Sequence, residues 1–375
     1  MKIAFTAPMK PLDHPVPSGD RTMGRLIVKA LESIGHDVTV ASRFRSWRKN
    51  GSDAIQAEVR TQALEEAERI AGDWERTGYR PDLILTYHLY HKAPDWIGPA
   101  LADRFDLPYA IVEASRAPKR RTGDWALGFA AADSALERAD AVAAIHNADA
   151  ECLAEVVPHQ RLSVLLPFLD AEPYLEASTA AKPLATLPLK LLAVGMMRAG
   201  DKERSYEILA DALERVRTLP WHLTIAGDGP VLDRVRGLFP PERVTFLGAL
   251  SPDALPALYA RHDLLVWPAI REAFGLVLLE AQAAGLGVVA GDTFGVPDIV
   301  RDGETGLLSP EGDAAALAVN LRRVLEEPEL ADRLGSVARQ HILDLHSLSS
   351  GAARLEALAE KAVRNHARRR EASKS

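Results

Sequence analysis

The segment REAFGLVLLEAQAAG, residues 271–285, constrains the fold of this chain more than any other part of the sequence. It carries Glu272 and Glu280, eight positions apart, with an almost wholly apolar run between them. Residues 263–268 indicate a buried strand that ends at a proline, and residues 286–290 indicate a second buried strand. The order strand, loop, helix and strand predicts a parallel α/β sheet, with Glu272 on the loop and Glu280 on the helix.

The loop in front of the predicted helix has the features of an anion-binding site. In an open parallel sheet, ligands bind at the carboxyl ends of the strands, where loops run into helix N-termini. A helix that begins near Phe274 and Gly275 directs free N–H groups and a positive dipole toward an anionic ligand. Gly275 has no Cβ, so the backbone can approach that ligand closely.

The pairing of Glu-Ala-Phe-Gly-Leu with Glu-Ala-x-Ala-x-Gly resembles the Glu-x7-Glu signature of retaining glycosyltransferases with the two-domain B-type architecture, most closely glycosyltransferase family 4. In that family the first glutamate contacts hydroxyls of the donor sugar and the second holds the ribose of the nucleotide. The resemblance implies these roles for Glu272 and Glu280, and donor contacts for Phe274, Gly275 and Leu276. A surface glutamate at a helix entrance and an ordinary helical glutamate are the alternative.

Composition limits the class of protein. The chain has 375 residues, enough for two domains, and its 47% hydrophobic and 26% charged residues are typical of a soluble globular protein. A formal charge of -7 argues against a general nucleic-acid binder. One cysteine excludes an internal disulfide, and the start of the chain has too short an apolar run for a signal peptide. We expect a cytoplasmic protein.

The beginning of the chain predicts a doubly wound α/β domain. Residues 2–6 indicate a buried strand, residues 23–34 a helix of clear 3.6-residue period, and residues 38–41 the next strand. No Gly-x-Gly-x-x-Gly follows the first strand, which argues against dinucleotide binding. Gly19, in the loop before the helix, could let a sugar or phosphate approach the backbone, and a plain turn glycine is the alternative.

A dense polar and aromatic segment, residues 87–96, follows the third predicted strand at residues 82–87. It includes His88 and indicates a place for an acceptor hydroxyl or a stacked sugar. The segment has no cysteine, and Asp95 is its only carboxylate, so a zinc site is not expected there.

Glu113 follows the fourth predicted strand at residues 109–112. Many members of the family carry a histidine at this point, close to the anomeric centre of the donor. The departure leaves that catalytic role to Glu113 or His88. A carboxylate there could accept a proton from the acceptor or stabilise positive charge on the sugar. Pairing of Glu113 with Arg116 or Lys119 is the alternative.

A basic run at residues 116–121, with further cations at residues 43–49, stands out in this acidic chain. It could bind an anionic acceptor, or make peripheral contact with anionic lipid at the inner face of a membrane. A solvated basic loop is the interpretation that we favour.

The second half of the chain departs from the family in its first loop. Family members often have Gly-Arg-x-x-x-x-Lys-Gly after the opening strand, where the arginine and lysine neutralise the donor diphosphate. Here Met196 stands in place of that arginine, and Arg198 and Lys202 lie in the same loop. Two cations beside a helix N-terminus can compensate a diphosphate without metal. A pair of solvated loop charges is the alternative.

A glycine turn follows the next predicted strand, in the sequence LTIAGDGP at residues 223–230. This turn is another feature of the family, and it implies a donor contact for Gly227. Leu232 occupies the third position of the Gly-x-Gly pattern, so the turn does not match a dinucleotide fingerprint.

Taken together, the resemblance implies two facing doubly wound Rossmann-like domains with a central cleft. We predict an acceptor-binding domain at 1–170, a linker at 171–188 and a nucleotide-sugar-binding domain at 189–345. A terminal helix at 346–375 would pack back on the first domain and end in a basic, frayed tail at residues 364–375.

The implied activity is transfer of a sugar from a nucleotide-diphosphate sugar to a glycan, lipid-linked or other hydroxyl acceptor, with retention of configuration. No metal and no other cofactor is expected. The family's common bacterial roles imply polysaccharide or glycan synthesis. Two alternatives remain. One is a different enzyme on the same scaffold, such as a sugar-nucleotide epimerase or a phosphorylase. The other is an inactive sugar-nucleotide-binding or partner subunit of the same fold, because Met196 and Glu113 depart from the family pattern.

Overall fold

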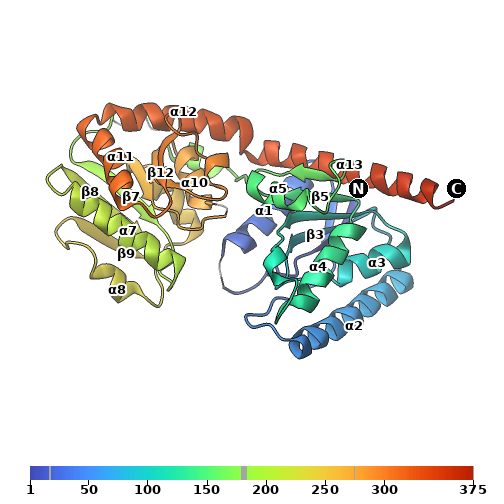
Figure 1. Cartoon of the computed structure of the whole chain (residues 1–375). Helices are drawn as coiled ribbons and strands as arrows, with labels where there is room; N and C mark the ends of the chain where they lie inside the picture. Colours follow the sequence, from blue (N-terminus) through green and yellow to red (C-terminus); the bar gives the residue numbers. More distant parts are fainter. Residues whose placement is uncertain (17, 179–183, 274, 375) are drawn as a thin grey trace. The chain divides into compact units, whose positions relative to one another are not determined.

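The computed structural model describes the chain apart from Pro17, residues 179–183, Phe274 and Ser375 (Figure 1). Contacts divide it into two compact units. The first unit combines Met1–Pro167 with Leu348–Ser375, and the second unit is Phe168–Ser347. Each unit holds one parallel six-stranded sheet flanked by helices, which confirms the predicted doubly wound α/β class. None of the described helices combines the length and the apolar character that a membrane crossing requires.

The first unit has the strand order β2-β1-β3-β4-β5-β6. Its elements are β1 (Lys2–Thr6), α1 (Gly19–Ser33), β2 (Asp37–Val40), α2 (Asp53–Thr77), β3 (Leu83–Leu89), α3 (Ile97–Phe105), β4 (Tyr109–Ala114), η1 (Pro118–Arg120), α4 (Ala126–Arg138), β5 (Ala141–Ala144), α5 (Asn147–Leu153), β6 (Leu162–Val164) and α13 (Leu348–Ala372). The strand order reverses between β1 and β3, and in sheets of this kind ligands bind beyond the carboxyl ends of the strands at such a reversal.

The second unit has the strand order β12-β11-β10-β7-β8-β9. Its elements are α6 (Glu172–Ala177), β7 (Leu189–Val194), α7 (Asp201–Arg215), β8 (Trp221–Ala226), α8 (Leu232–Arg236), β9 (Val244–Gly248), η2 (Pro252–Ala254), α9 (Leu255–Tyr259), β10 (Leu264–Trp267), α10 (Leu276–Ala283), β11 (Gly287–Asp292), η3 (Val296–Asp298), β12 (Gly306–Pro310), α11 (Ala314–Glu326) and α12 (Glu329–Leu345). Here the strand order reverses between β7 and β10.

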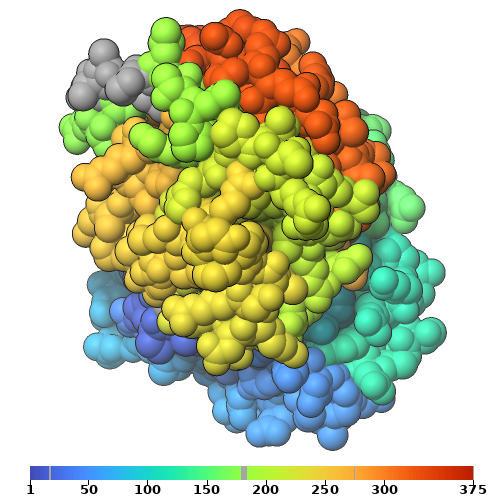
Figure 2. Space-filling view, turned by 90° about the vertical axis from the view of Figure 1, so that its left-hand side faces the viewer, coloured from blue at the N-terminus to red at the C-terminus, as the bar shows by residue number. Residues whose placement is uncertain are grey.

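Helix α10 has apolar residues all round because it is enclosed by other elements. It contacts β10, β11 and α12, and its Leu278, Leu279 and Ala281 are fully buried. A helix without a polar face is stable only in such surroundings. On the outer face of this unit, the lime-coloured α7 and the yellow segment with α8 lie side by side (Figure 2).

Three segments differ from the sequence-based expectations. Strand β3 continues through His88 to Leu89, beyond the predicted end at Tyr87, because it pairs with β4 as far as Ala114. Part of the predicted linker forms the helix α6, and Tyr174 of that helix is buried in the second unit.

The C-terminal basic segment is helical to Ala372, so the expected frayed tail from Arg364 is wrong. Side-chain contacts with the first unit explain the difference. Arg369 pairs with the buried Asp140 at 3.2 Å, and Arg370 pairs with Asp106 at 2.9 Å. Helix α13 also packs on α1, β4 and β5.

Candidate functional site

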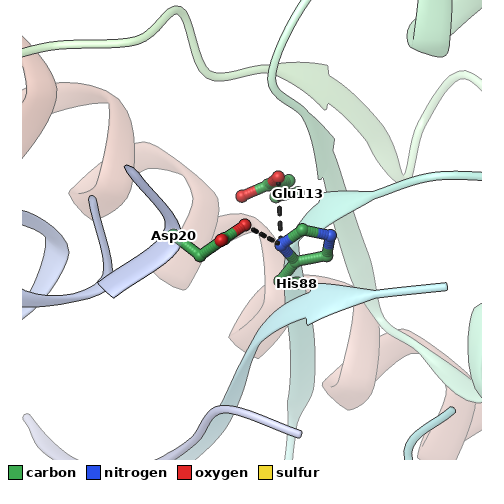
Figure 3. A group of neighbouring side chains, drawn as sticks. All are labelled: Asp20, His88 and Glu113. Atoms are coloured by element: carbon green, nitrogen blue, oxygen red, sulfur yellow. Dashed lines mark ion pairs between the residues drawn. The ribbon is translucent and has the colours of Figure 1, made fainter. Parts of the chain in front are cut away.

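Two groups of polar side chains lie at the points where the strand order reverses, one in each unit. In the first unit the group consists of Asp20, His88 and Glu113 (Figure 3). Asp20 lies in the first turn of α1, directly after the loop from β1, while His88 is on β3 and Glu113 on β4. The Nδ1 atom of His88 lies 3.2 Å from Asp20 Oδ1 and 3.2 Å from Glu113 Oε1.

The three groups shift one another's pKa values because they share a buried space. Burial disfavours the imidazolium, but the charges of Glu113 and Asp20 outweigh burial and raise the pKa of His88 to about 9. Burial raises the pKa of Glu113 to about 8, against the opposing effect of His88. Burial acts on Asp20 too, but its hydrogen bond to His88 prevails and lowers the pKa of this carboxyl. At neutral pH we expect an ionised Asp20, a cationic His88 and a protonated Glu113.

The backbone at this site is held in an unusual conformation. His88 has a φ of 64° and Glu113 a φ of 59°, in the left-handed region that residues with a Cβ seldom adopt. Such conformations persist where the surrounding structure enforces them, and they gather at functional sites. Two of them on neighbouring strands support the interpretation of this group as a ligand site.

Unsatisfied polar atoms also support the interpretation of this group as a ligand site. Glu113 Oε2 and Tyr87 Oη are buried, and neither makes a hydrogen bond of good geometry among the described residues, although the two groups act on each other's pKa. Buried polar atoms are nearly always paired, so a ligand or water is expected beside them. The ligand atoms of Asp20, His88 and Glu113 lie within 4.8 Å of one another, so this set could also hold a cation.

The remaining candidates of the first unit have separate surroundings. Gly19 is the first residue of α1, next to the cap residue Ser18, which accepts a hydrogen bond from Arg21 N at 3.3 Å.

Arg116 is not a solvated cation. Its side chain is 3% exposed and pairs with Asp133 at 2.9 Å and with Glu155 at 3.2 Å. The basic run therefore begins with a structural residue, and the proposed pairing of Arg116 with Glu113 is not seen.

In the second unit, Lys202 and Glu272 form an ion pair at the reversal between β7 and β10. Lys202 lies in the first turn of α7, and Glu272 follows β10. The indole of Trp267 donates to the same Glu272 oxygen at 3.2 Å, and the Lys202 ammonium lies 5.2 Å from the centre of that ring. The carboxylate is thus oriented by two donors.

The turn at Gly227 leaves no room for a side chain. Gly227 has a φ of 150°, and a Cβ there would lie 1.9 Å from the carbonyl oxygen of Gly195. Tyr206 donates to that same carbonyl at 2.7 Å. The loop after β7 and the turn after β8 therefore pack directly against each other, close to Lys202.

Helix α10 begins at Leu276, as the sequence predicts. Gly275 is its cap residue, with a φ of 57°, and no side chain caps the free N–H groups of the first turn. Leu276 is half-buried at that terminus. Phe274, which the sequence assigns to donor binding, lies outside the described residues.

Glu280 lies one helical turn further along α10 and is held by tyrosines. The Tyr259 hydroxyl donates to Glu280 Oε2 at 2.7 Å. Burial raises the pKa of Glu280 to about 7, although Tyr259 and Tyr174 act in the opposite direction. Tyr174 also packs edge-on against Tyr259, with ring centres 5.8 Å apart.

The structure brings some predicted residues together and separates others. Lys202 contacts Glu272, whereas Arg198 is exposed in the same loop. Asp20, Tyr259 and Trp267 were not predicted. Asp20 could have been found from its position in the first turn of a helix that follows a strand, but the two aromatic residues carry no pattern of their own.

Comparison with known proteins shows that parts of this chain are similar in sequence to glycosyltransferases. Residues 185–341 match the sequence model of the family described as Glycosyl transferases group 1. Sulfoquinovosyl transferase SQD2 of Arabidopsis thaliana is 35% identical over 156 residues, which cover 41% of this chain and 30% of that protein. Glycogen synthase of Mycobacterium tuberculosis is 29% identical over 345 residues, which cover 87% of this chain and 78% of that protein.

A solved structure extends the likeness to the whole chain. Anabaena HepE in complex with UDP superimposes with a TM-score of 0.71 at 17% identity, covering 96% of this chain and 100% of that one. At this identity the likeness shows the fold. The sequence match to the plant relative spans less than a third of its length.

Proposed function

Because the chain belongs to the superfamily of glycosyltransferases with the GT-B fold, with a group 1 domain over residues 185–341, we propose that it transfers a sugar from a nucleotide-diphosphate sugar to a hydroxyl acceptor. The observation that carries this proposal is the Lys202–Glu272 pair beside the open N-terminus of α10, with Glu280 on the same helix. Together they offer a cation, free N–H groups and two carboxylates at the reversal of strand order.

Each part of this site suits one part of the donor. The leaving nucleoside diphosphate carries two phosphate groups, and Lys202, Arg198 and the first turn of α10 supply compensating charge and N–H donors. Glu272 would accept hydrogen bonds from the donor sugar, in an orientation fixed by Trp267. Gly227 closes the floor of the site without a side chain that could block the donor.

Glu280 would hold the ribose. Two ribose hydroxyls can donate to one carboxylate, which requires the ionised form of Glu280. The raised pKa, about 7, means that nucleotide binding competes with protonation near neutral pH. UDP is the first nucleotide to test, since the similar HepE was solved with UDP.

The first unit would bind the acceptor at Asp20, His88 and Glu113. Glu113 Oε2 lacks a partner in the described structure and could contact the acceptor hydroxyl. Once deprotonated, above its pKa of about 8, it could take up the hydroxyl proton. The cationic His88 would stabilise the Glu113 carboxylate before it takes up that proton.

The finer assignments follow from the sequence motif. Retention of configuration and membership of family 4 rest on the match of Glu272 and Glu280 to Glu-x7-Glu. Catalysis without metal rests on two cations that can neutralise a diphosphate, Lys202 paired with Glu272 and Arg198 in the loop before α7.

The test has two stages. Melting temperature is first measured against a panel of nucleoside diphosphates and their sugars, since a ligand of the folded state raises it. Release of nucleoside diphosphate from the stabilising donor is then followed with glycan and lipid-linked acceptors. We expect stabilisation by one nucleotide, reduced in Glu280→Ala, and its release from the matching sugar nucleotide. Binding without release would favour the partner-subunit alternative, and no stabilisation would refute the proposal.

A further inference from the structure

We propose that the acceptor carries a phosphate group and that the first unit recognises it through a cluster of cations beside Asp20, His88 and Glu113. We call this cluster the basic edge. Its members are Arg45, Arg48, Lys92, Lys119 and Arg120. This inference rests on the proposed function, because it names the class of molecule that the acceptor site takes.

The first three members are brought together by hydrogen bonds between two loops. Residues 41–52 connect β2 to α2, and residues 90–96 connect β3 to α3. Ser46 Oγ donates to the carbonyl of Pro94 at 2.7 Å, and Arg48 N donates to the carbonyl of Lys92 at 3.1 Å. Arg48 is thereby fixed next to Lys92, and its Nη1 atom donates to the carbonyl of Arg45 at 2.9 Å.

The last two members come from a third loop, between β4 and α4. Lys119 and Arg120 lie in the short helix η1 and are exposed. Burial, together with repulsion from Lys92, Arg120 and Lys119, lowers the pKa of His91 to about 4. The imidazole of His91 therefore lies in a positive potential from two loops at once.

Carboxylates do not neutralise these cations. Within the described ranges, no member of the basic edge forms an ion pair with an acidic side chain, whereas neighbouring cations do. Arg116 pairs with Asp133, and Arg43 pairs with Asp13 at 2.5 Å. Burial lowers the pKa of Arg45, and the charge of Arg48 adds to that effect. Like charges held at one edge repel one another, and an anion that binds there relieves that repulsion.

The basic edge adjoins the catalytic candidates. Asp20 acts electrostatically on Arg45 and on Tyr90, and Arg120 acts on the same Tyr90. A phosphate bound by the basic edge would therefore leave another part of the same molecule near His88 and Glu113. The donor diphosphate does not account for these cations, since the proposed donor site in the second unit has its own.

Phosphate fits this arrangement better than a neutral sugar does. Arginine and lysine are the side chains that proteins use for phosphate, through charge-assisted hydrogen bonds. The aromatic rings among the cations support the same conclusion. The Arg45 guanidinium lies 4.4 Å from the centre of the Trp47 ring, and the Lys92 ammonium lies 5.3 Å from that of Trp125. Such contacts orient the cations without neutralising them.

The experiment measures binding of inorganic phosphate by isothermal titration, with UDP first added to saturation so that the donor site is filled. Sodium chloride of equal ionic strength serves as the control ligand. The variant is Lys92→Gln/Arg120→Gln. The matched control is Arg76→Gln/Arg364→Gln, which removes two exposed, ion-paired cations of the same unit. Vesicles of phosphatidylcholine, with and without phosphatidylglycerol, are tested for sedimentation with each protein.

We expect the wild type and the control to bind phosphate with the same affinity. The affinity of the Lys92→Gln/Arg120→Gln variant should be lower by about tenfold or more, because each lost charge-assisted hydrogen bond has an effect of that size. Binding to phosphatidylglycerol vesicles alone, lost in the same variant, would identify the phosphate as that of a lipid headgroup. Equal binding by the variant and the wild type, or binding of neither probe, would overturn the proposal. Failure of every nucleoside diphosphate in the panel, UDP included, to bind would refute the proposed function instead.

Discussion

The two units place their polar groups at the same point of two similar sheets, yet they assemble different chemistry there. Asp20 follows β1 in the first unit, and Lys202 follows β7 in the second, each in the first turn of the next helix. The first unit then adds His88 and Glu113 from strands, whereas the second adds Glu272 from a loop. The topology decides where a ligand can bind, and the side chains decide which ligand.

The pKa values at the two sites differ because the side chains that meet there differ. In the first unit one imidazole stands between two carboxyl groups, so the pKa of His88 rises to about 9, while burial raises the pKa of Glu113 to about 8. In the second unit the ammonium of Lys202 pairs directly with Glu272, and burial raises the pKa of Glu280, whose partners are tyrosines, to about 7. A proton-transfer role suits the first arrangement, and binding of a charged donor suits the second.

Replacing Glu113 with glutamine should have the largest effect. The loss of a general acid–base group typically lowers a rate by about 100-fold or more. We expect a fall of that size in nucleoside diphosphate release, with unchanged UDP affinity. In the wild type the rate should rise with pH as Glu113 loses its proton near pH 8, and the variant should lack that rise. Glu137→Gln, on an exposed position of α4, is the control.

Replacing Lys202 with methionine should weaken UDP binding by about tenfold to 100-fold, because a charge-assisted hydrogen bond contributes about 1.5–3 kcal/mol. Isothermal titration measures the change. Arg204→Gln, which removes a neighbouring exposed cation paired with Glu207, should bind UDP as the wild type does. Normal UDP affinity of the Lys202→Met variant would show that the Lys202–Glu272 ion pair is not part of the donor site.

The pH dependence of UDP binding tests Glu280. The carboxylate form accepts the ribose hydroxyls, and protonation below pH 7 removes it. Below the pKa, the ionised fraction of Glu280 falls about tenfold for each pH unit. UDP affinity should therefore fall about tenfold from pH 8 to pH 6. Glu280→Gln should bind UDP more weakly at pH 8 and show no such fall. An unchanged pH dependence in that variant would assign the titration to another group.

Replacing Tyr259 with phenylalanine should have the smallest effect. It removes the 2.7 Å hydrogen bond to Glu280, worth about 1 kcal/mol, so UDP binding should weaken by about fivefold at pH 7. Because Tyr259 lowers the pKa of Glu280, the midpoint of the pH dependence should also move upward. A weaker affinity with an unmoved midpoint would indicate loss of packing alone.

The sequence predicted the second site better than the first because its residues lie in continuous motifs. Glu272, Gly275 and Glu280 belong to one segment, and its strands and helix are the observed β10 and α10. The first site joins positions 20, 88 and 113, which only the strand order brings together. His88 and Glu113 could be proposed singly, but their shared contact with Asp20 could not.

Some features had no sequence signal at all. Tyr259 reaches Glu280 from α9 because the two helices pack together, and the pattern of α9 indicates only a buried aromatic residue. The basic C-terminal segment predicted fraying, because the acidic partners Asp106 and Asp140 are more than 200 positions away. Long-range ion pairs of this kind depend on the finished fold.

The assignment of the donor to the second unit is tested most directly by comparing Glu280 and Glu113, one from each unit, in the same assay. UDP is titrated into the wild type, Glu280→Ala and Glu113→Gln, with binding heat as the readout. We expect one UDP to bind per chain, with binding at least about tenfold weaker in Glu280→Ala and unchanged in Glu113→Gln. Normal binding by Glu280→Ala, or loss of binding in Glu113→Gln alone, would contradict the assignment of the donor to the second unit.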